Sequence, residues 1–521
     1  MAAIIEVLTN QEAKEVIVLT VAALHLPVQV EVAQDQAHIG EILQEVHLEV
    51  HPRVDLLLEV RINQVPDLAT SHEMILQEPV LLEVNPQQVA QIEISGIIRI
   101  MGRNKLLIVS LDAVSMADLE ILKQSTFINK IIGDGSLVED VSPVFVSNTY
   151  PIHTSVITGC YPNKHGIFDN VKPLPMESTP GWFWYSNDIN VQTLYNQATL
   201  NNLTTASILW PVTAGAKIKY NIPEIFPTKA YETQAFLSLS NGSPLFTLKS
   251  ILKYRNIFKG ISQPGLDDFS CSVMCDVILE KNPDLMLIHF TDVDTNKHNY
   301  GISSAEAKEA LLRMDKRVSK LFDALSAVNN VDDFHVIIFS DHGMSDVQHT
   351  VDPNIFLKNA NLIDYDQSGK IKTWEAWMKG CGGSAFCYLN PKSSQSKSSL
   401  ESEVKDLLVK EFQNSSSGFK RYLDEDEITL SGFKRDCVFG ISASAGYELL
   451  NNSEKAHKAN HGYPISDGGY NTFYFVYGPM INKGLSLNGG NLLEIAPLAC
   501  KLLDIPLWKM DGRIRSELLK K

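Results

Sequence analysis

The stretch Lys105–Leu111 reads KLLIVSL and is followed directly by Asp112. An unbroken run of mostly apolar residues is typical of a strand buried on both faces of a parallel sheet. Two later runs have the same form, DLMLIHF at 284–290 and FHVIIFS at 334–340, and each also leads into acidic residues. The chain therefore repeats one unit, an apolar strand that ends in a carboxylate.

Helical patterns separate these strands. Residues 303–328 place apolar side chains at helical spacing, from Ala307 to Leu325, and residues 471–481 predict a later strand. Strands that alternate with helices predict an α/β fold with a mostly parallel sheet. Between residues 345 and 460 the pattern is less regular and includes the polar stretches SSQSKSS and QNSSSG. We expect a smaller subdomain to be inserted there.

The first 100 residues differ from the rest, because they contain no Phe, Tyr, Trp or Cys. They carry 12 Glu and 3 Asp against 3 Arg and 1 Lys, a net charge of −11 out of −16 for the chain. Alternation of apolar residues and Glu through residues 30–60 favours strands, but a core without aromatic side chains would be unusual. Three interpretations of residues 1–100 stay open: a small β-rich module, an extension, or a miscalled start, because MGRNKLLIVSLD at Met101 looks like a natural beginning. The main domain is then 101–521.

Composition narrows the function classes. A length of 521 residues with 44% apolar residues suits one large domain with embellishments. The net charge of −16 argues against a nucleic-acid-binding surface, although bound metal ions would still allow nucleotides to bind. The sequence does not indicate an oligomeric state.

Compartment signals are few. Seven scattered cysteines form no CxxC pair, which favours a reducing compartment. The sequence has no apolar run long enough for a transmembrane segment, and its first residues do not form a secretion signal. We therefore expect a cytoplasmic protein by default, with export as the alternative if the start is miscalled.

Acids and histidines recur together after the predicted strands. They lie in LLIVSLDAVS, TDVDTNKHNYG, SDHGM and NHGYP, and the six residues are Asp112, Asp294, His298, Asp341, His342 and His461. Three carboxylates and three imidazoles suffice for two sets of three ligands to divalent ions. A lone Asp at a strand end more often caps a turn. Buried acids and histidines without partners are costly, however, and metal ions remove that cost.

A further segment, SNTYPIHTSVITGCYPNKHGIFDN at 147–170, supplies Thr149 as a candidate nucleophile for phosphoryl transfer. Together with the acid and histidine segments, in this order, it resembles the nucleotide pyrophosphatase/phosphodiesterase family of the alkaline phosphatase superfamily. The likeness covers most of residues 105–480. It implies an alkaline-phosphatase-like, mostly parallel sheet sandwiched by helices, with a smaller inserted subdomain and an extra N-terminal segment.

The resemblance also implies roles for individual residues. One zinc ion would be held by Asp294, His298 and His461, and the other by Asp112, Asp341, His342 and the oxygen of Thr149. Asn170 matches a family Asn that binds a phosphate oxygen, although from the residue alone we would interpret it as part of a turn. Two Zn²⁺ ions are expected because histidine ligands favour zinc over magnesium, with Mn²⁺ as the alternative.

These roles predict a hydrolase that cleaves phosphodiester or pyrophosphate bonds in small-molecule, nucleotide-type substrates. Thr149 would attack in line and form a phosphothreonine intermediate that is then hydrolysed. The aromatic residues of GWFWYSND, among them Trp182, Trp184 and Tyr185, are candidates to stack on a nucleobase, although such clusters more often pack in a core.

Several residues depart from the family pattern. Val293, Lys297 and Ile152 stand where the family usually has Pro, Gly and Asn. None of them removes a ligand, but we expect Lys297 to alter the charge at the mouth of the site. His289, inside a strand pattern, is interpreted as a satisfied core histidine.

Two other functions remain open. The first is a phosphomonoesterase or phosphonate hydrolase of the same superfamily. A monoester dianion calls for an Arg, and the sequence has none between Asp112 and Asn170, which favours diesters. The second is a catalytically inactive binding module, which the presence of all six ligand types and Thr149 argues against.

Overall fold

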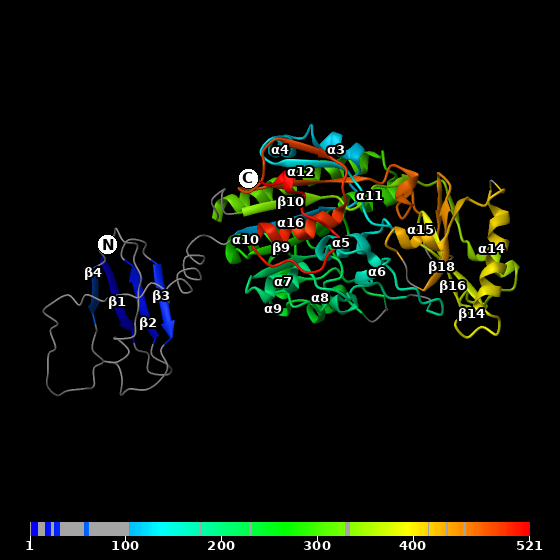
Figure 1. The fold of residues 1–521 in the computed structure, drawn as a ribbon, viewed down its shortest axis with the longest axis horizontal. Helices are drawn as coiled ribbons and strands as arrows, with labels where there is room; N and C mark the ends of the chain where they lie inside the picture. Colours follow the sequence, from blue (N-terminus) through cyan, green and yellow to red (C-terminus); the bar gives the residue numbers. More distant parts are fainter. Residues whose placement is uncertain are drawn as a thin grey trace, which may run out of the picture. The chain divides into compact units, whose positions relative to one another are not determined.

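The computed structural model describes strands β1 to β4 and residues 104–521, except 178–179, 229–231, 329–333, 415, 434–435 and 452–454. The chain divides into two units, Met1–Gly102 and Arg103–Lys521 (Figure 1). In the first unit, β1 (Ala2–Leu8) pairs antiparallel with β2 (Val16–Val21) and parallel with β4 (Leu57–Arg61), while β3 (Leu26–Glu31) pairs with β2. Most of residues 30–60, for which the alternation predicts strands, lies outside the described residues.

The second unit is built on an eight-stranded sheet of order β22-β6-β21-β10-β5-β9-β7-β8. The strands are β5 (Lys105–Leu111), β6 (Ser136–Val141), β7 (Thr205–Ile208), β8 (Tyr220–Ile222), β9 (Leu285–Phe290), β10 (Phe334–Phe339), β21 (Thr472–Tyr477) and β22 (Leu485–Asn488). From β10 to β8 all neighbours are parallel, whereas β21 runs antiparallel to both of its neighbours. The predicted α/β fold with a mostly parallel sheet is confirmed.

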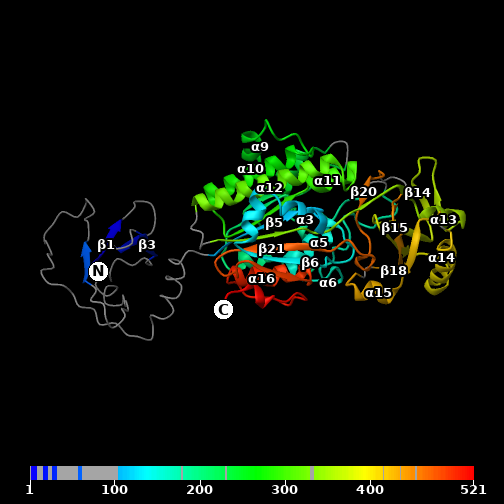
Figure 2. The same cartoon turned by 90° about the horizontal axis from the view of Figure 1, so that it is seen from above.

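Helices cover both faces of this sheet. Successive side chains of a strand point to opposite sides, so each buried strand contributes apolar residues to both faces. Leu107 and Val109 of β5 pack in one core with α10 (Gly265–Lys281) and α12 (Ala305–Val328). Leu106 and Ile108 of the same strand pack in a second core with α5 (Thr149–Thr158), α7 (Leu194–Leu200) and α16 (Ile495–Leu502). Figure 2 shows α10 and α12 on one side of the sheet and α16 on the other.

A second, smaller sheet lies within the range in which a subdomain is predicted. It has the order β15-β16-β18-β17 and is antiparallel throughout. Its strands are β15 (Ala376–Gly380), β16 (Ser384–Leu389), β17 (Phe419–Leu423) and β18 (Cys437–Ala443), and α13 (Asn354–Asn359), α14 (Lys397–Glu411) and α15 (Glu425–Leu430) accompany them. Aromatic residues such as Phe386 and Phe433, whose ring centroids are 4.3 Å apart, form its core.

After the smaller sheet, the chain returns to the large sheet and forms a short pairing between two-residue strands. β20 (Ala459–Asn460) pairs with β11 (Ser345–Asp346), so the segment that follows β10 lies beside the segment that precedes His461.

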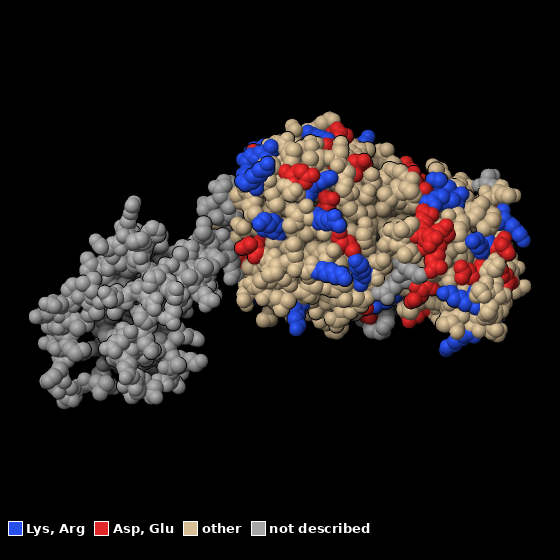
Figure 3. Space-filling view, in the orientation of Figure 1, with Lys and Arg blue, Asp and Glu red and all other residues tan. Residues whose placement is uncertain are grey.

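Charge is mixed on the surface of the second unit. Figure 3 shows Lys and Arg interspersed with Asp and Glu on the face that it draws. Within the described part of the chain, none of the helices has the length and apolar character needed to cross a membrane.

Candidate metal centre and nucleophile

Three neighbouring strands place the acids at one edge of the large sheet. β10, β5 and β9 are adjacent and parallel, so their carboxyl ends lie side by side, where α/β sheets bind ligands. Asp112 directly follows β5, and Asp341 follows β10 after one residue. β9 leads into α11 (Asp292–Tyr300), which presents Asp294 and His298 one helical turn apart.

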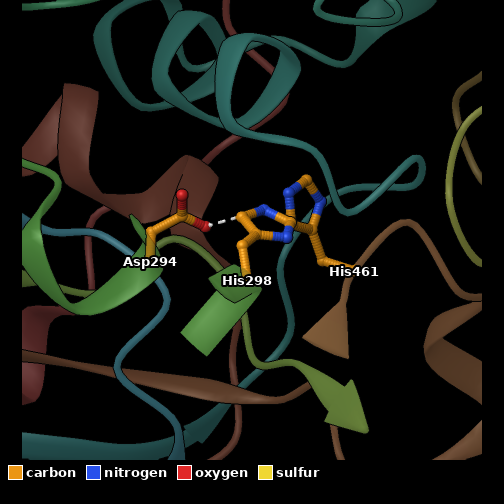
Figure 4. A group of neighbouring side chains, drawn as sticks. All are labelled: Asp294, His298 and His461. Carbon is orange, nitrogen blue, oxygen red and sulfur yellow. Dashed lines mark ion pairs between the residues drawn. The ribbon is translucent and has the colours of Figure 1, made fainter. Parts of the chain in front are cut away.

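The six predicted ligands converge in two groups of three. The Asp294 group contains Asp294, His298 and His461, and the Asp112 group contains Asp112, Asp341 and His342. Within each group the candidate ligand atoms lie within 4.8 Å of one another. Figure 4 shows the Asp294 group, with the carboxylate of Asp294 directed at His298 and its Oδ1 3.3 Å from Nε2 of that ring. The structure thus brings together residues that are up to 349 positions apart, from 112 to 461.

Thr149 lies beside the Asp112 group. It is the first residue of α5, and its Oγ1 is 3.4 Å from Nε2 of His342. The two groups adjoin each other, because the rings of His342 and His461 stack with their centroids 4.0 Å apart. The candidate nucleophile and both groups therefore share one site.

The donor atoms fit bound divalent cations. Asp112 Oδ1, Asp294 Oδ1 and Asp341 Oδ2 are buried and have no hydrogen-bond partner among the described residues. These are the oxygens that face histidine nitrogens, since His342 Nε2 is 3.5 Å from Asp112 Oδ1 and 3.3 Å from Asp341 Oδ2. A buried carboxylate oxygen without a partner is costly, so the arrangement favours a cation between these atoms.

Hydrogen bonds orient two of the histidines for ligation. Nδ1 of His298 donates to the carbonyl of Ala459 at 2.8 Å, and Nδ1 of His461 donates to Asn148 Oδ1 at 2.8 Å. A proton on Nδ1 leaves Nε2 with a lone pair, which is the tautomer that a metal ion requires.

Burial and mutual repulsion shift the pKa values of these groups. Burial raises the pKa of Asp112 well above its ordinary value, and the carboxylates of Asp341 and Asp294 raise it further. Burial lowers the pKa values of His342 and His461, which keeps both rings neutral and able to ligate. A cation among the acids would relieve their repulsion.

Asn170 lies next to Thr149, as the resemblance implies for a phosphate-binding residue. Its side-chain Oδ1 accepts a hydrogen bond of 2.9 Å from the backbone N–H of Tyr150, the residue after Thr149. Its own N–H donates to Asp169 Oδ1 at 2.7 Å. The contact with phosphate itself stays a prediction.

The structure adds a buried network next to Thr149 that the sequence did not reveal. Asp169 accepts from Asn148 Nδ2 at 2.8 Å and forms an ion pair of 2.6 Å with Lys379 of β15. Asn148 in turn holds His461, so the smaller sheet is linked to a predicted metal ligand. No sequence signal identifies Lys379, because it comes from a strand 210 residues after Asp169.

His289 is buried and hydrogen-bonded, as expected of a core histidine, but one partner is a predicted metal ligand. Its Nε2 lies 3.0 Å from Asp112 Oδ2, and its Nδ1 lies 2.8 Å from Glu224 Oε2. Burial alone would lower the pKa of His289, but hydrogen bonds to these two carboxylates raise it well above its ordinary value. His289 therefore fixes the orientation of Asp112. Glu224 lies in a loop without a motif, so the sequence could not have revealed it.

The expectation for Lys297 is wrong. Its side chain is 1% exposed and does not reach the mouth of the site. Nζ donates to the carbonyl of Ala113 at 2.8 Å and pairs with Asp118, the third residue of α3 (Met116–Leu122). The buried ion pair neutralises the charge of Lys297, whose role is to hold the turn after Asp112.

The three predicted substrate aromatics are in different environments. Trp182 packs edge-on against Tyr150, with ring centroids 5.4 Å apart, and against Phe226 at 6.2 Å. Trp184 is buried, whereas Tyr185 is 40% exposed. Trp182 thus contacts the residue that follows Thr149. Stacking on a nucleobase stays a prediction for all three aromatic residues.

Comparison with known proteins agrees with this fold and site. The model of the family "Type I phosphodiesterase / nucleotide pyrophosphatase" matches residues 106–464. The chain belongs to this family and is a type I phosphodiesterase/nucleotide pyrophosphatase-like hydrolase of the alkaline phosphatase superfamily.

Individual relatives have low sequence identity to this chain, but their alignments with it cover most of both chains. Bis(5'-adenosyl)-triphosphatase ENPP4 of Bos taurus is 23% identical over 427 residues, 78% of this chain and 80% of that protein. Ectonucleotide pyrophosphatase/phosphodiesterase family member 7 of Mus musculus is 22% identical over 427 residues, 79% of this chain and 86% of that protein. The structure of murine ectonucleotide pyrophosphatase/phosphodiesterase 5 has a TM-score of 0.58 at 18% identity and covers 80% of this chain and 100% of its own, which supports the fold.

Proposed function

We propose that this chain hydrolyses phosphodiester or pyrophosphate bonds of nucleotide-type substrates through a phosphothreonine intermediate on Thr149. The observation that carries the proposal is the position of Thr149 Oγ1, 3.4 Å from His342 Nε2 and beside both groups of predicted ligands. The family and its relatives support the reaction class and the kind of substrate.

Different residues of the chain would have different roles around the phosphorus atom. Thr149 begins the ten-residue helix α5, whose dipole favours negative charge at this end. Asn170 uses its Oδ1 to accept from Tyr150, so its Nδ2 is the group to donate to a phosphate oxygen. Asn170 Nδ2 and the positive end of α5 would hold the phosphoryl group while Thr149 attacks on the side opposite the leaving group.

Two divalent cations would be held by the Asp294 group and by the Asp112 group with Thr149 Oγ1. Histidine in both groups favours Zn²⁺, with Mn²⁺ as the alternative. When bound, such ions lower the pKa of an adjacent hydroxyl and stabilise charge on the attacking and leaving oxygens.

Removal of the nucleophile tests the proposal. Thr149→Ala should reduce hydrolysis of a nitrophenyl nucleotide diester by about 1000-fold or more while leaving two metal ions per chain. Metal content by mass spectrometry and the rate of nitrophenol release measure the two properties. Thr158→Ala, which removes a buried hydroxyl from the same helix, is the matched control and should keep its activity. A Thr149→Ala variant that retains more than a few per cent of activity would falsify the assignment.

Substrate class is tested on the unmodified chain loaded with zinc. Rates are compared for a nitrophenyl nucleotide diester, a simple nitrophenyl diester and a nitrophenyl monoester, each with and without chelator. The nucleotide diester should be preferred, and chelator should abolish its hydrolysis. Preference for the monoester would contradict the proposal.

A further inference from the structure

An apolar surface lies at the edge of the second unit, away from the predicted metal centre. α8 (Gln234–Asn241) and α9 (Pro244–Lys253) pack together beside the edge strand β8. Figure 1 shows both helices at the edge of the unit, and Figure 2 shows α9 outside α10. Five large apolar side chains between residues 236 and 261 are exposed there: Phe236, Leu245, Leu248, Leu252 and Ile261. We refer to these five residues as the α9 face.

The helical spacing of α9 places its leucines in one stripe. Leu245, Leu248 and Leu252 follow the i, i+3, i+7 pattern, and their exposed fractions are 76%, 43% and 54%. Thr247 and Ser250, on the opposite side of the helix, are buried. Phe246 and Ile251 of the same helix pack against the core, so α9 has one packed side and a second apolar side formed by its exposed leucines. Single exposed leucines are ordinary, but a contiguous stripe marks a contact surface.

The segment that carries this face is basic, whereas the whole chain is acidic. Residues 233–266 contain four basic residues and no Asp or Glu, in a protein of net charge −16. Lys253 pairs with Asp276 at 2.6 Å, so it contributes little charge outward. The remaining three, Lys249, Arg255 and Lys259, are exposed. Exposed leucines flanked by cations are the pattern of a helix that lies on an anionic membrane.

We propose that the α9 face docks the protein on the surface of anionic lipid bilayers. The leucine stripe would enter the interface between headgroups and acyl chains, and Lys249, Arg255 and Lys259 would meet the phosphate and carboxylate groups of the lipids. This proposal is independent of the chemistry proposed for Thr149, because none of these residues belongs to the metal centre.

Vesicle co-sedimentation of the full chain loaded with zinc tests the proposal. The probes are vesicles of phosphatidylcholine alone and vesicles of phosphatidylserine with phosphatidylcholine, each at low and high salt. Binding is expected to the anionic vesicles and to weaken with salt. The variant Lys249→Gln/Arg255→Gln/Lys259→Gln should bind about 100-fold more weakly. The variant Leu245→Ser/Leu248→Ser/Leu252→Ser should lose at least about tenfold.

The matched controls remove the same kinds of side chain from other parts of the surface. Lys316→Gln/Lys392→Gln/Lys397→Gln removes three exposed cations, and Leu312→Ser/Leu430→Ser removes two exposed leucines. Both controls should bind like the unmodified chain, and all variants should keep diester hydrolysis. Failure of the unmodified chain to bind anionic vesicles, or equal losses in the controls, would overturn the proposal.

Sedimentation velocity separates the remaining alternatives. If the leucine variant changes the oligomeric state while no vesicle binds, a second copy covers the α9 face. If it changes only the shape of the monomer, residues 1–102, which are acidic overall, cover it. Either result would replace the membrane as the partner.

Discussion

At the scale of single residues, His289 links the hydrophobic core to the predicted metal centre. Its ring bridges Asp112 and Glu224, and Glu224 also accepts a hydrogen bond of 3.2 Å from Tyr150. One buried imidazole therefore orients a predicted metal ligand and connects through Glu224 to Tyr150, the residue after Thr149. Partners of this kind set the orientation and basicity of metal ligands.

Replacement of His289 should weaken metal binding without unfolding the chain. We expect His289→Gln to lower the affinity of the Asp112 group for Zn²⁺ by roughly 10–100-fold, because Asp112 loses the partner that fixes its carboxylate. Metal content after dialysis against graded chelator measures the change. His335→Gln, which changes a buried histidine on β10, separated from β9 by β5, serves as control. Equal metal retention in the two variants would contradict the role of His289.

His335 itself should make stability depend on pH. Burial lowers the pKa of His335 to about 4, below the ordinary value of 6.5. Between these values the unfolded chain binds the proton and the folded chain does not, so the folded state loses stability as pH falls from 6.5 to 4. The difference in free energy of unfolding between the unmodified chain and His335→Gln should fall by about 3 kcal/mol over this range. Urea denaturation at several pH values measures it, and a constant difference would refute the prediction.

At the scale of elements, α11 has to be held firmly because it carries both Asp294 and His298. Asp267 of α10 accepts the backbone N–H groups of Thr291 and Asp292 at the start of α11, at 3.1 and 2.9 Å. The carboxylate of Asp292 is bound by Arg317 of α12 at 2.8 Å. Three elements are thus joined by a buried ionic network next to the site.

Removal of the Arg317 side chain from this network should lower the stability of the folded chain. Arg317→Met leaves Asp267 and Asp292 buried with less compensation, so the free energy of unfolding should fall by about 3–5 kcal/mol. The neighbouring Lys316→Met, which changes an exposed residue of the same helix, should have little effect. Chemical denaturation of the two variants gives the comparison. A loss below about 1 kcal/mol for Arg317→Met would mean that the network contributes little.

At the scale of the whole molecule, the predicted metal centre joins parts of the chain that are far apart in the sequence. The two groups draw on the ends of β5, β9 and β10 and on the segment after β20. Cations bound there would tie the large sheet to the chain that returns from the smaller sheet. Metal binding is therefore expected to stabilise the folded unit.

Metal removal should lower thermal stability. Free Zn²⁺ at 100 times its dissociation constant should add about 3 kcal/mol per site to the free energy of unfolding, and chelator should remove this gain. Differential scanning fluorimetry with and without chelator measures the shift of the midpoint. The midpoint of Asp112→Asn/Asp294→Asn should respond much less to chelator. An identical response in this variant would show that the stabilising ions bind elsewhere.

The sequence alone determined the main features of the fold and the composition of the candidate site. The apolar runs that end in acids identified β5, β9 and β10, because burial on both faces of a sheet restricts the residue types of a strand locally. The order of the motifs indicated the family, because ligand chemistry restricts the residue types at the site. Only the structure showed that β21 runs antiparallel to its neighbours, since an apolar run carries no information on the direction of a strand. The same is true of the partners Glu224, Asp169 and Lys379 and of the burial of Lys297. Hydrogen bonds between distant segments depend on how the chain packs, and no local pattern records them.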